Sequence, residues 1–391
     1  MRTNSVCASG KTGTVSVGDP AGAGRLFSLD VFRGLTVALM IIVNNGNGPS
    51  FSQLEHSAWN GWTLTDLVFP FFLFITGVSL TFSFSSRLQT GSKTAQLPHI
   101  VRRAAIIFAL GLLLNGCPHY VLATWRVYGV LQRIAIGYLV ASVLYLWCGR
   151  RTRWAVIAAC LLGYWILMRW VPVPGYGVPS VCVPLLDPDR NLAAWLDRKL
   201  LMGHLYEGVR DPEGLLSTLP ALGTVLFGVA VGEWIRALRT EPVRLVRRLV
   251  AAGVLCFVAG ELWATVFPIN KKLWTSSYVL VTAGLAMLAL AACYWIVDLK
   301  QNRGRWTVLP LVFGTNTIFA YALSEFAAIY FWATKVTVDG KPVSLHELFC
   351  QHTVYYIPSQ HWTSLAYTLM FTAFCWCATW LLYRKRIFLK I

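Results

Sequence analysis

The chain alternates long apolar segments with short polar ones. Ten apolar segments, most of about twenty residues, recur between residues 28 and 383. An α-helix needs about that length to cross the hydrocarbon core of a bilayer. The predicted spans are 28–46, 65–85, 100–116, 127–147, 154–171, 218–237, 248–267, 275–297, 308–332 and 362–383. The pattern therefore predicts an all-α fold, a polytopic membrane bundle of about ten transmembrane helices.

Composition agrees with this prediction. Of the 391 residues, 56% are hydrophobic and 13% are charged, whereas about a quarter of the residues of a soluble protein are charged. Residues 1–24 are rich in Gly, Ser and Thr and lack the apolar core of a signal peptide. We expect residues 1–24 to be a disordered cytoplasmic arm and residues 25–391 to be one transmembrane domain.

The net charge of +17 would suggest a nucleic-acid partner in a soluble chain. Here most of the Lys and Arg residues fall in loops on one side of the predicted bundle, and that side is normally cytoplasmic. We therefore expect cytoplasmic termini, a lipid bilayer as the main partner and no nucleic acid. The same assignment places three loops together on the far side: the one that contains His56, the Pro-rich loop 171–217, and Phe267–Trp274.

The ten cysteines do not indicate a metal site. Most lie inside apolar segments, where cysteine is usually a small core residue, and no CxxC pair occurs. We expect no bound metal.

The most informative polar residues are His56, which precedes the second predicted span, and Asp66, which lies at the start of that span. An imidazole oriented by a carboxylate can take up a proton or attack an acyl carbon. The alternatives are an interfacial histidine and a carboxylate that stabilises the start of a helix. Ionisable groups are costly at a membrane, so the pair is a candidate site.

Four other residues are candidates with plain structural alternatives. Asn44 ends the first span, where its amide could donate to an oxyanion or cap the helix. Arg33 follows Asp30 by three residues, so the two share a helix face and are expected to pair. Arg133 lies in an apolar span and needs an anion, either a ligand or a side chain such as Asp66 or Glu325. Lys390 belongs to a basic tail that suits anionic lipid or a polyphosphate.

A family resemblance is carried by two long blocks, SLDVFRGLTVALMIIVNN and HSAWNGWTLTDLVFPFFLFITGVSL. It continues in YGVLQRIAIGY, RDPEGLLSTLP, FPINKKLWTSSYV, FGTNTIFAYALSEF and LYRKRIFLKI. These blocks resemble the heparan-α-glucosaminide N-acetyltransferase family of transmembrane acyltransferases. The chain is similar to a bacterial member that lacks the luminal N-terminal domain.

The resemblance implies an enzyme that moves acetyl from cytoplasmic acetyl-CoA to the amine of a hexosamine on the far side of the membrane. It implies that His56 is the active-site histidine, acting as general base or transient acetyl carrier, with Asn44 and Asp66 beside it. We expect Arg33, Arg133 and Lys390 to bind the CoA phosphates. The resemblance also suggests a homodimer and a bacterial inner-membrane location. An amino-sugar permease without acyl transfer is the alternative, and a membrane scaffold is a third.

Overall fold

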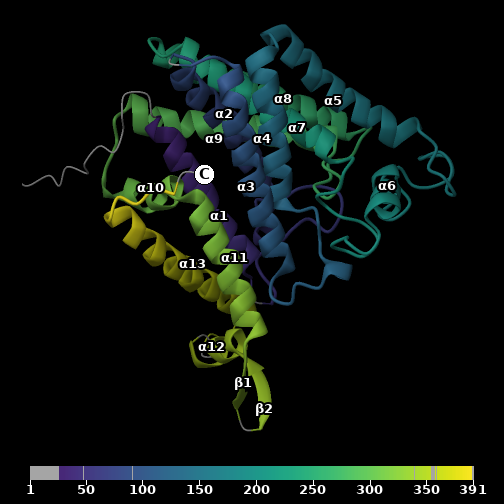
Figure 1. Ribbon diagram of the computed structural model, residues 1–391, viewed down its shortest axis with the longest axis vertical. Helices are drawn as coiled ribbons and strands as arrows, with labels where there is room; N and C mark the ends of the chain where they lie inside the picture. The colour runs from purple at the N-terminus through teal and green to yellow at the C-terminus, as the bar shows by residue number, and fades with distance from the viewer. Residues whose placement is uncertain are drawn as a thin grey trace, which may run out of the picture.

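The computed structural model describes residues 26–389 except 47, 90, 339, 354–356 and 358. The predicted arm, residues 1–24, and Lys390 lie outside the described residues. The fold is mostly helical, with helices packed side by side and a small hairpin projecting at one end (Figure 1).

The larger helices follow the apolar segments closely. They are α1 (Phe27–Asn44), α2 (Val68–Arg87), α3 (Leu97–Gly116), α4 (Val130–Trp147), α5 (Arg150–Trp170), α7 (Thr218–Ala237), α8 (Pro242–Ala264), α9 (Ser276–Cys293), α10 (Val308–Thr315), α11 (Thr317–Ala333) and α13 (Gln360–Arg384). Two further helices lie between them, α6 (Leu192–Leu201) and α12 (Leu345–Thr353). Short 3-10 turns occur at Ser52–Leu54, Thr65–Leu67, Thr94–Gln96, Leu122–Thr124 and Arg305–Thr307. Helix α9 continues as a π-helix over Tyr294–Leu299.

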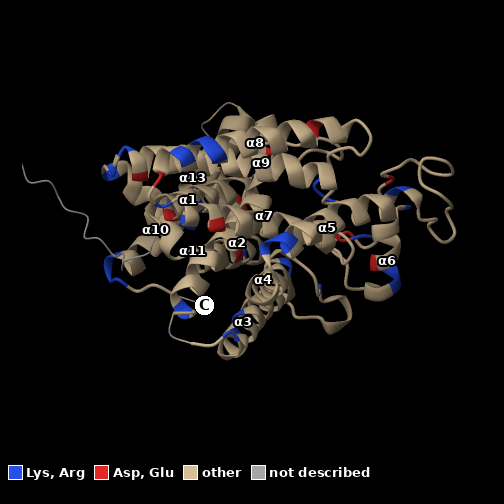
Figure 2. Ribbon diagram, turned by 90° about the horizontal axis from the view of Figure 1, so that it is seen from above, with Lys and Arg blue, Asp and Glu red and all other residues tan. Residues whose placement is uncertain are grey.

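The predicted count of ten spans is not confirmed. Within the described part of the chain, seven helices are long and apolar enough to cross a membrane, and α10 with α11 would add an eighth. Helices do form at the fifth and seventh predicted spans, but arginines lie at both ends of α5, and three arginines and Glu261 lie in α8. Elsewhere charged positions are sparse along the ribbon (Figure 2).

The ninth predicted span is bent by 77° between α10 and α11. Asn316 lies at the break and is fully buried. Its Nδ2 donates to the carbonyl of Ile387 over 3.1 Å, and its Oδ1 accepts from the amide of Leu389 over 3.0 Å. These two hydrogen bonds hold the end of the described tail against the bundle at the bend.

The predicted all-α fold has one addition. Strands β1 (Lys335–Val338) and β2 (Lys341–Ser344) pair antiparallel, with Lys335 opposite Ser344. The hairpin and α12 lie between α11 and α13 and project from the bundle (Figure 1).

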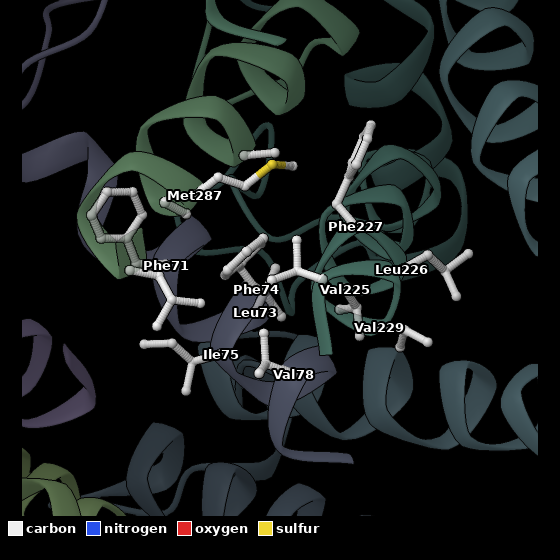
Figure 3. Close-up of a cluster of buried hydrophobic side chains, with 14 of the residues drawn as sticks. Phe71, Leu73, Phe74, Ile75, Val78, Val225, Leu226, Phe227, Val229 and Met287 are labelled. Carbon is white, nitrogen blue, oxygen red and sulfur yellow. The ribbon is translucent and has the colours of Figure 1, made fainter. Parts of the chain in front are cut away.

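The core centres on the contact between α2 and α7, where apolar side chains of both helices interdigitate with α9 (Figure 3). Glycines allow the two backbones to approach closely. A Cβ on Gly228 would lie 2.0 Å from the Phe74 carbonyl oxygen, and one on Gly77 would lie 2.0 Å from the Val225 carbonyl oxygen. Gly228 and Gly232 form the small-xxx-small spacing that is common where membrane helices touch.

We expect Gly228→Ala to destabilise the bundle, because its methyl group would overlap the backbone of α2. Overpacking of this kind costs about 1–3 kcal/mol. Gly163→Ala in α5 is the matched control, since no atom lies within 4 Å of its added Cβ. Thermal unfolding in detergent should separate the two variants, and equal stability would contradict the proposed contact.

Candidate functional site

Asp66 organises the loop that carries His56. Its carboxylate lies in the turn just before α2 and is buried. Oδ1 lies 2.8 Å from His56 Nδ1, and Oδ2 accepts from the amides of Ser57 and Thr63 over 3.1 and 3.0 Å. The Tyr278 hydroxyl donates to the Asp66 backbone carbonyl. The carboxylate thus orients the imidazole, which leaves the lone pair of the ring on Nε2 when Nδ1 donates its proton to Asp66.

The two members of the pair differ in accessibility. The His56 side chain is 48% exposed, and that of Asp66 is 1% exposed. The predicted partnership of His56 and Asp66 is therefore present, with a buried orienting group and an accessible ring.

Sequence reasoning missed a third charged group at this pair. Lys271 Nζ lies 2.9 Å from His56 Nδ1, 3.1 Å from His56 Nε2 and 3.7 Å from Asp66 Oδ1. Burial lowers the pKa of the Lys271 ammonium, while the Asp66 carboxylate acts in the opposite direction. The only sequence signal was the position of Lys271 in FPINKKLW, one of the three loops expected to converge.

That convergence is confirmed by hydrogen bonds between the loops. Gly61 donates its amide to the Ile269 carbonyl over 2.8 Å, and Asn270 Nδ2 donates to the Trp59 carbonyl over 2.9 Å. Trp59 Nε1 in turn donates to the carbonyl of Leu186, in the long loop, over 2.8 Å. These hydrogen bonds hold the three loops together at the His56 end of the bundle.

Arg133 has partners other than those considered from the sequence. It is 1% exposed and donates to Ser217 Oγ over 2.5 Å and to the Gly214 carbonyl over 3.2 Å. Its guanidinium also lies 5.0 Å from the centre of the buried Trp274 ring. These contacts join α4 to the start of α7, so the arginine is held at a structural junction.

Acidic residues gather beside this junction. Asp211 accepts two hydrogen bonds from Arg126, over 2.9 and 2.6 Å, and Glu213 lies 2.5 Å from the same guanidinium. Asp197 in α6 accepts from the Leu215 amide over 2.9 Å. Burial raises the pKa of the Asp197 carboxyl to about 6, and the neighbouring Asp211 charge adds to the increase. The sequence indicated a turn at Asp211 and Glu213, but not their pairing with Arg126.

A cavity of about 340 Å³ runs through the other half of the bundle. One stripe of α2, from Phe72 to Arg87, lines it along fifteen residues, which is about 22 Å of helix. Arg33 and Arg103, from the first two turns of α1 and α3, line the cavity with Arg87. The rest of the lining is mainly apolar.

The arginines of the cavity are held in different ways. Arg33 pairs with Asp30 over 2.9 Å, as predicted, and donates to Ser79 Oγ over 2.6 Å. Arg103 lies 4.7 Å from the centre of the Tyr138 ring, and its buried Nε has no hydrogen-bond partner among the described residues. A buried guanidinium nitrogen without a partner suits an anionic ligand.

Asn44 is at the end of α1, where its side chain is hydrogen-bonded to the Glu325 carboxyl of α11. Its role as a donor to an oxyanion stays a prediction.

Comparison with known proteins identifies the family. The catalytic-domain family model described as heparan-alpha-glucosaminide N-acetyltransferase matches residues 25–262. The chain belongs to this family. It is 31% identical to the mouse heparan-alpha-glucosaminide N-acetyltransferase and 30% identical to the human one, over 94% of this chain in both cases. The chain spans about three fifths of the length of these relatives, 61% and 60%.

The acetyltransferase-family match includes His56, Asp66 and the three cavity arginines. Lys271 lies beyond residue 262 and is therefore outside the match to the family model. The alignment with the mouse relative covers 94% of this chain.

Asp197→Asn should change stability in a pH-dependent way, since asparagine keeps an acceptor for the Leu215 amide and removes the charge. The folded-state pKa of Asp197 lies above its unfolded value, so ionisation costs stability as pH rises from about 4 through about 6. We expect the variant to be more stable than the parent at pH 7.5, by on the order of 2–3 kcal/mol, and equal to it near pH 4.

Thermal unfolding in detergent between pH 4 and pH 8 checks this expectation. Asp187→Asn is the contrasting control, because its hydrogen bond from Arg190 lowers the pKa of Asp187. That variant should lose stability relative to the parent at neutral pH. A pH-independent difference for Asp197→Asn would contradict the account.

Proposed function

We propose that this chain transfers an acetyl group from acetyl-CoA to the amine of a hexosamine, with His56 at the reacting centre. The observation that carries the proposal is an exposed imidazole oriented by a buried carboxylate, 2.8 Å away, in the transmembrane acetyltransferase family. The mouse and human relatives are named heparan-alpha-glucosaminide N-acetyltransferase, which denotes transfer of an acetyl group to the nitrogen of a glucosaminide.

The cavity supports the choice of donor. Acetyl-CoA has an anionic phosphate end and a long, weakly polar arm that ends in a thioester. Arg87 and Arg103 at one end of the cavity suit the phosphates, and the apolar wall suits the arm. Phe72, at the other end of the α2 stripe, is six residues after Asp66, roughly 9 Å along a helix. The donor thioester would thus approach His56 from within the bundle.

Two routes are compatible with this geometry. In the first, Nε2 removes a proton from the acceptor amine as the amine attacks the thioester carbon, and CoA leaves as the thiol. In the second, Nε2 attacks the thioester carbon, CoA leaves, and the amine then displaces the imidazole from the acetyl group. Both routes require an unprotonated Nε2 at the start.

The charge pattern supports one orientation in the membrane. Positive loops at the arginine end favour a cytoplasmic location for that end, so CoA would arrive from the cytoplasm. The three loops at the His56 end would receive the acceptor on the opposite face, in a bacterial inner membrane.

His56→Ala should abolish transfer of labelled acetyl from acetyl-CoA to glucosamine by purified protein. The expected loss is at least about 10²-fold, as for other acid–base groups. His361→Ala is the matched control and should keep activity, since His361 packs on Phe51 instead of Asp66. Activity that survives in His56→Ala would contradict the role assigned to His56. Sugar uptake without a CoA requirement would favour a permease.

Arg103→Met should raise KM for acetyl-CoA by about 10-fold or more, because one charge-assisted hydrogen bond is worth about 1.5–3 kcal/mol. Because the lost contact is to a remote phosphate, kcat should change little. Arg102→Met, which removes an exposed neighbouring arginine, is the control. Unaltered kinetics in Arg103→Met, or equal effects in both variants, would exclude this cavity as the donor site.

A further inference from the structure

Lys271 occupies an unusual position beside His56. Its ammonium is within 3.1 Å of both ring nitrogens and 3.7 Å from the carboxylate that orients the ring. The position is built into the fold, because Asn270 and Ile269 are hydrogen-bonded to the loop that carries His56. The Lys271 side chain is 20% exposed, so water screens its charge only in part.

The charged groups around the imidazole have opposite effects on its protonation. The Asp66 carboxylate favours the imidazolium, and the Lys271 ammonium disfavours it. Farther out, Glu213 and Lys272 act on Lys271 with opposite signs. Glu55, the residue before His56, accepts from the Ser50 amide over 2.7 Å. The two charges nearest the ring are therefore one anion and one cation.

We propose that Lys271 is a positioning residue that keeps His56 neutral, with its proton on Nδ1 and its lone pair on Nε2. Asp66 alone would orient the ring and also favour its cation, which can neither accept a proton nor attack a thioester. Lys271 opposes that second effect. The flexible four-carbon stem of lysine lets Nζ stay beside the ring while a substrate reaches Nε2.

The effect of Lys271 on catalysis rests on the proposed function, whereas its effect on the charge state of the His56 imidazole does not. A chemical readout can therefore test the inference independently of acetyl transfer. Diethyl pyrocarbonate acylates neutral imidazole, and peptide mass spectrometry measures the extent of reaction at His56 alone. The rate of this modification against pH reports how much of the ring is unprotonated.

Lys271→Met keeps the length of the side chain and removes the charge. We expect the pH at which His56 reacts at half its maximal rate to rise, because removing a positive charge beside the ring favours its protonated form. Lys271→Arg should restore the parent profile. Lys272→Met is the matched control: its ammonium pairs with Glu207 over 2.8 Å, and the profile should stay unchanged.

An unchanged midpoint in Lys271→Met, or the same shift in Lys272→Met, would overturn the inference. If the parent transfers acetyl, the acidic limb of its pH–rate profile should move to higher pH in Lys271→Met by the same amount. If the parent transfers none, the proposed function fails and the modification experiment still decides the role of Lys271.

Discussion

The site depends on one buried carboxylate at the start of a membrane helix. Asp66 accepts from His56, from Ser57 and from Thr63, so a single side chain closes the loop before α2 and aims the imidazole. Leaving such a group without partners in a low-dielectric environment would be costly. The hydrogen bonds that satisfy Asp66 are the same ones that give His56 its orientation.

Glycines allow the helices around this carboxylate to pack closely. Gly77 lies against the backbone of Val225, and Gly228 lies against the backbone of Phe74, so α2 and α7 come together on one face. The opposite stripe of α2 lines the long cavity between Phe72 and Arg87. One helix therefore carries the core contact and the cavity wall, and the turn just before it carries Asp66, which is hydrogen-bonded to His56.

Local features of the sequence predicted much of this arrangement. Apolar length indicated where the helices lie, three-residue spacing predicted the pair of Asp30 and Arg33, and the composition around His56 pointed to the site. The bend at Asn316 depends on contacts with the tail about seventy residues later, which no local pattern contains. The neighbourhood of Lys271 likewise depends on a contact across more than two hundred residues.

The partners of Arg133 likewise could not be predicted from local sequence. Its burial in an apolar span was evident from the sequence, but its partners come from the start of α7 and from a loop that folds back over the bundle. The count of ten spans is not confirmed, because charged residues shorten the apolar stretches of α5 and α8, which both form as helices.

The central claim is that donor and histidine meet at the inner end of the cavity. Electron cryo-microscopy of the protein with a non-transferable acetyl-CoA analogue tests it most directly. We predict that the phosphates lie against Arg87 and Arg103 and that the carbonyl carbon lies within contact distance of His56 Nε2. Analogue density outside this cavity, or a thioester end directed away from His56, would contradict the account.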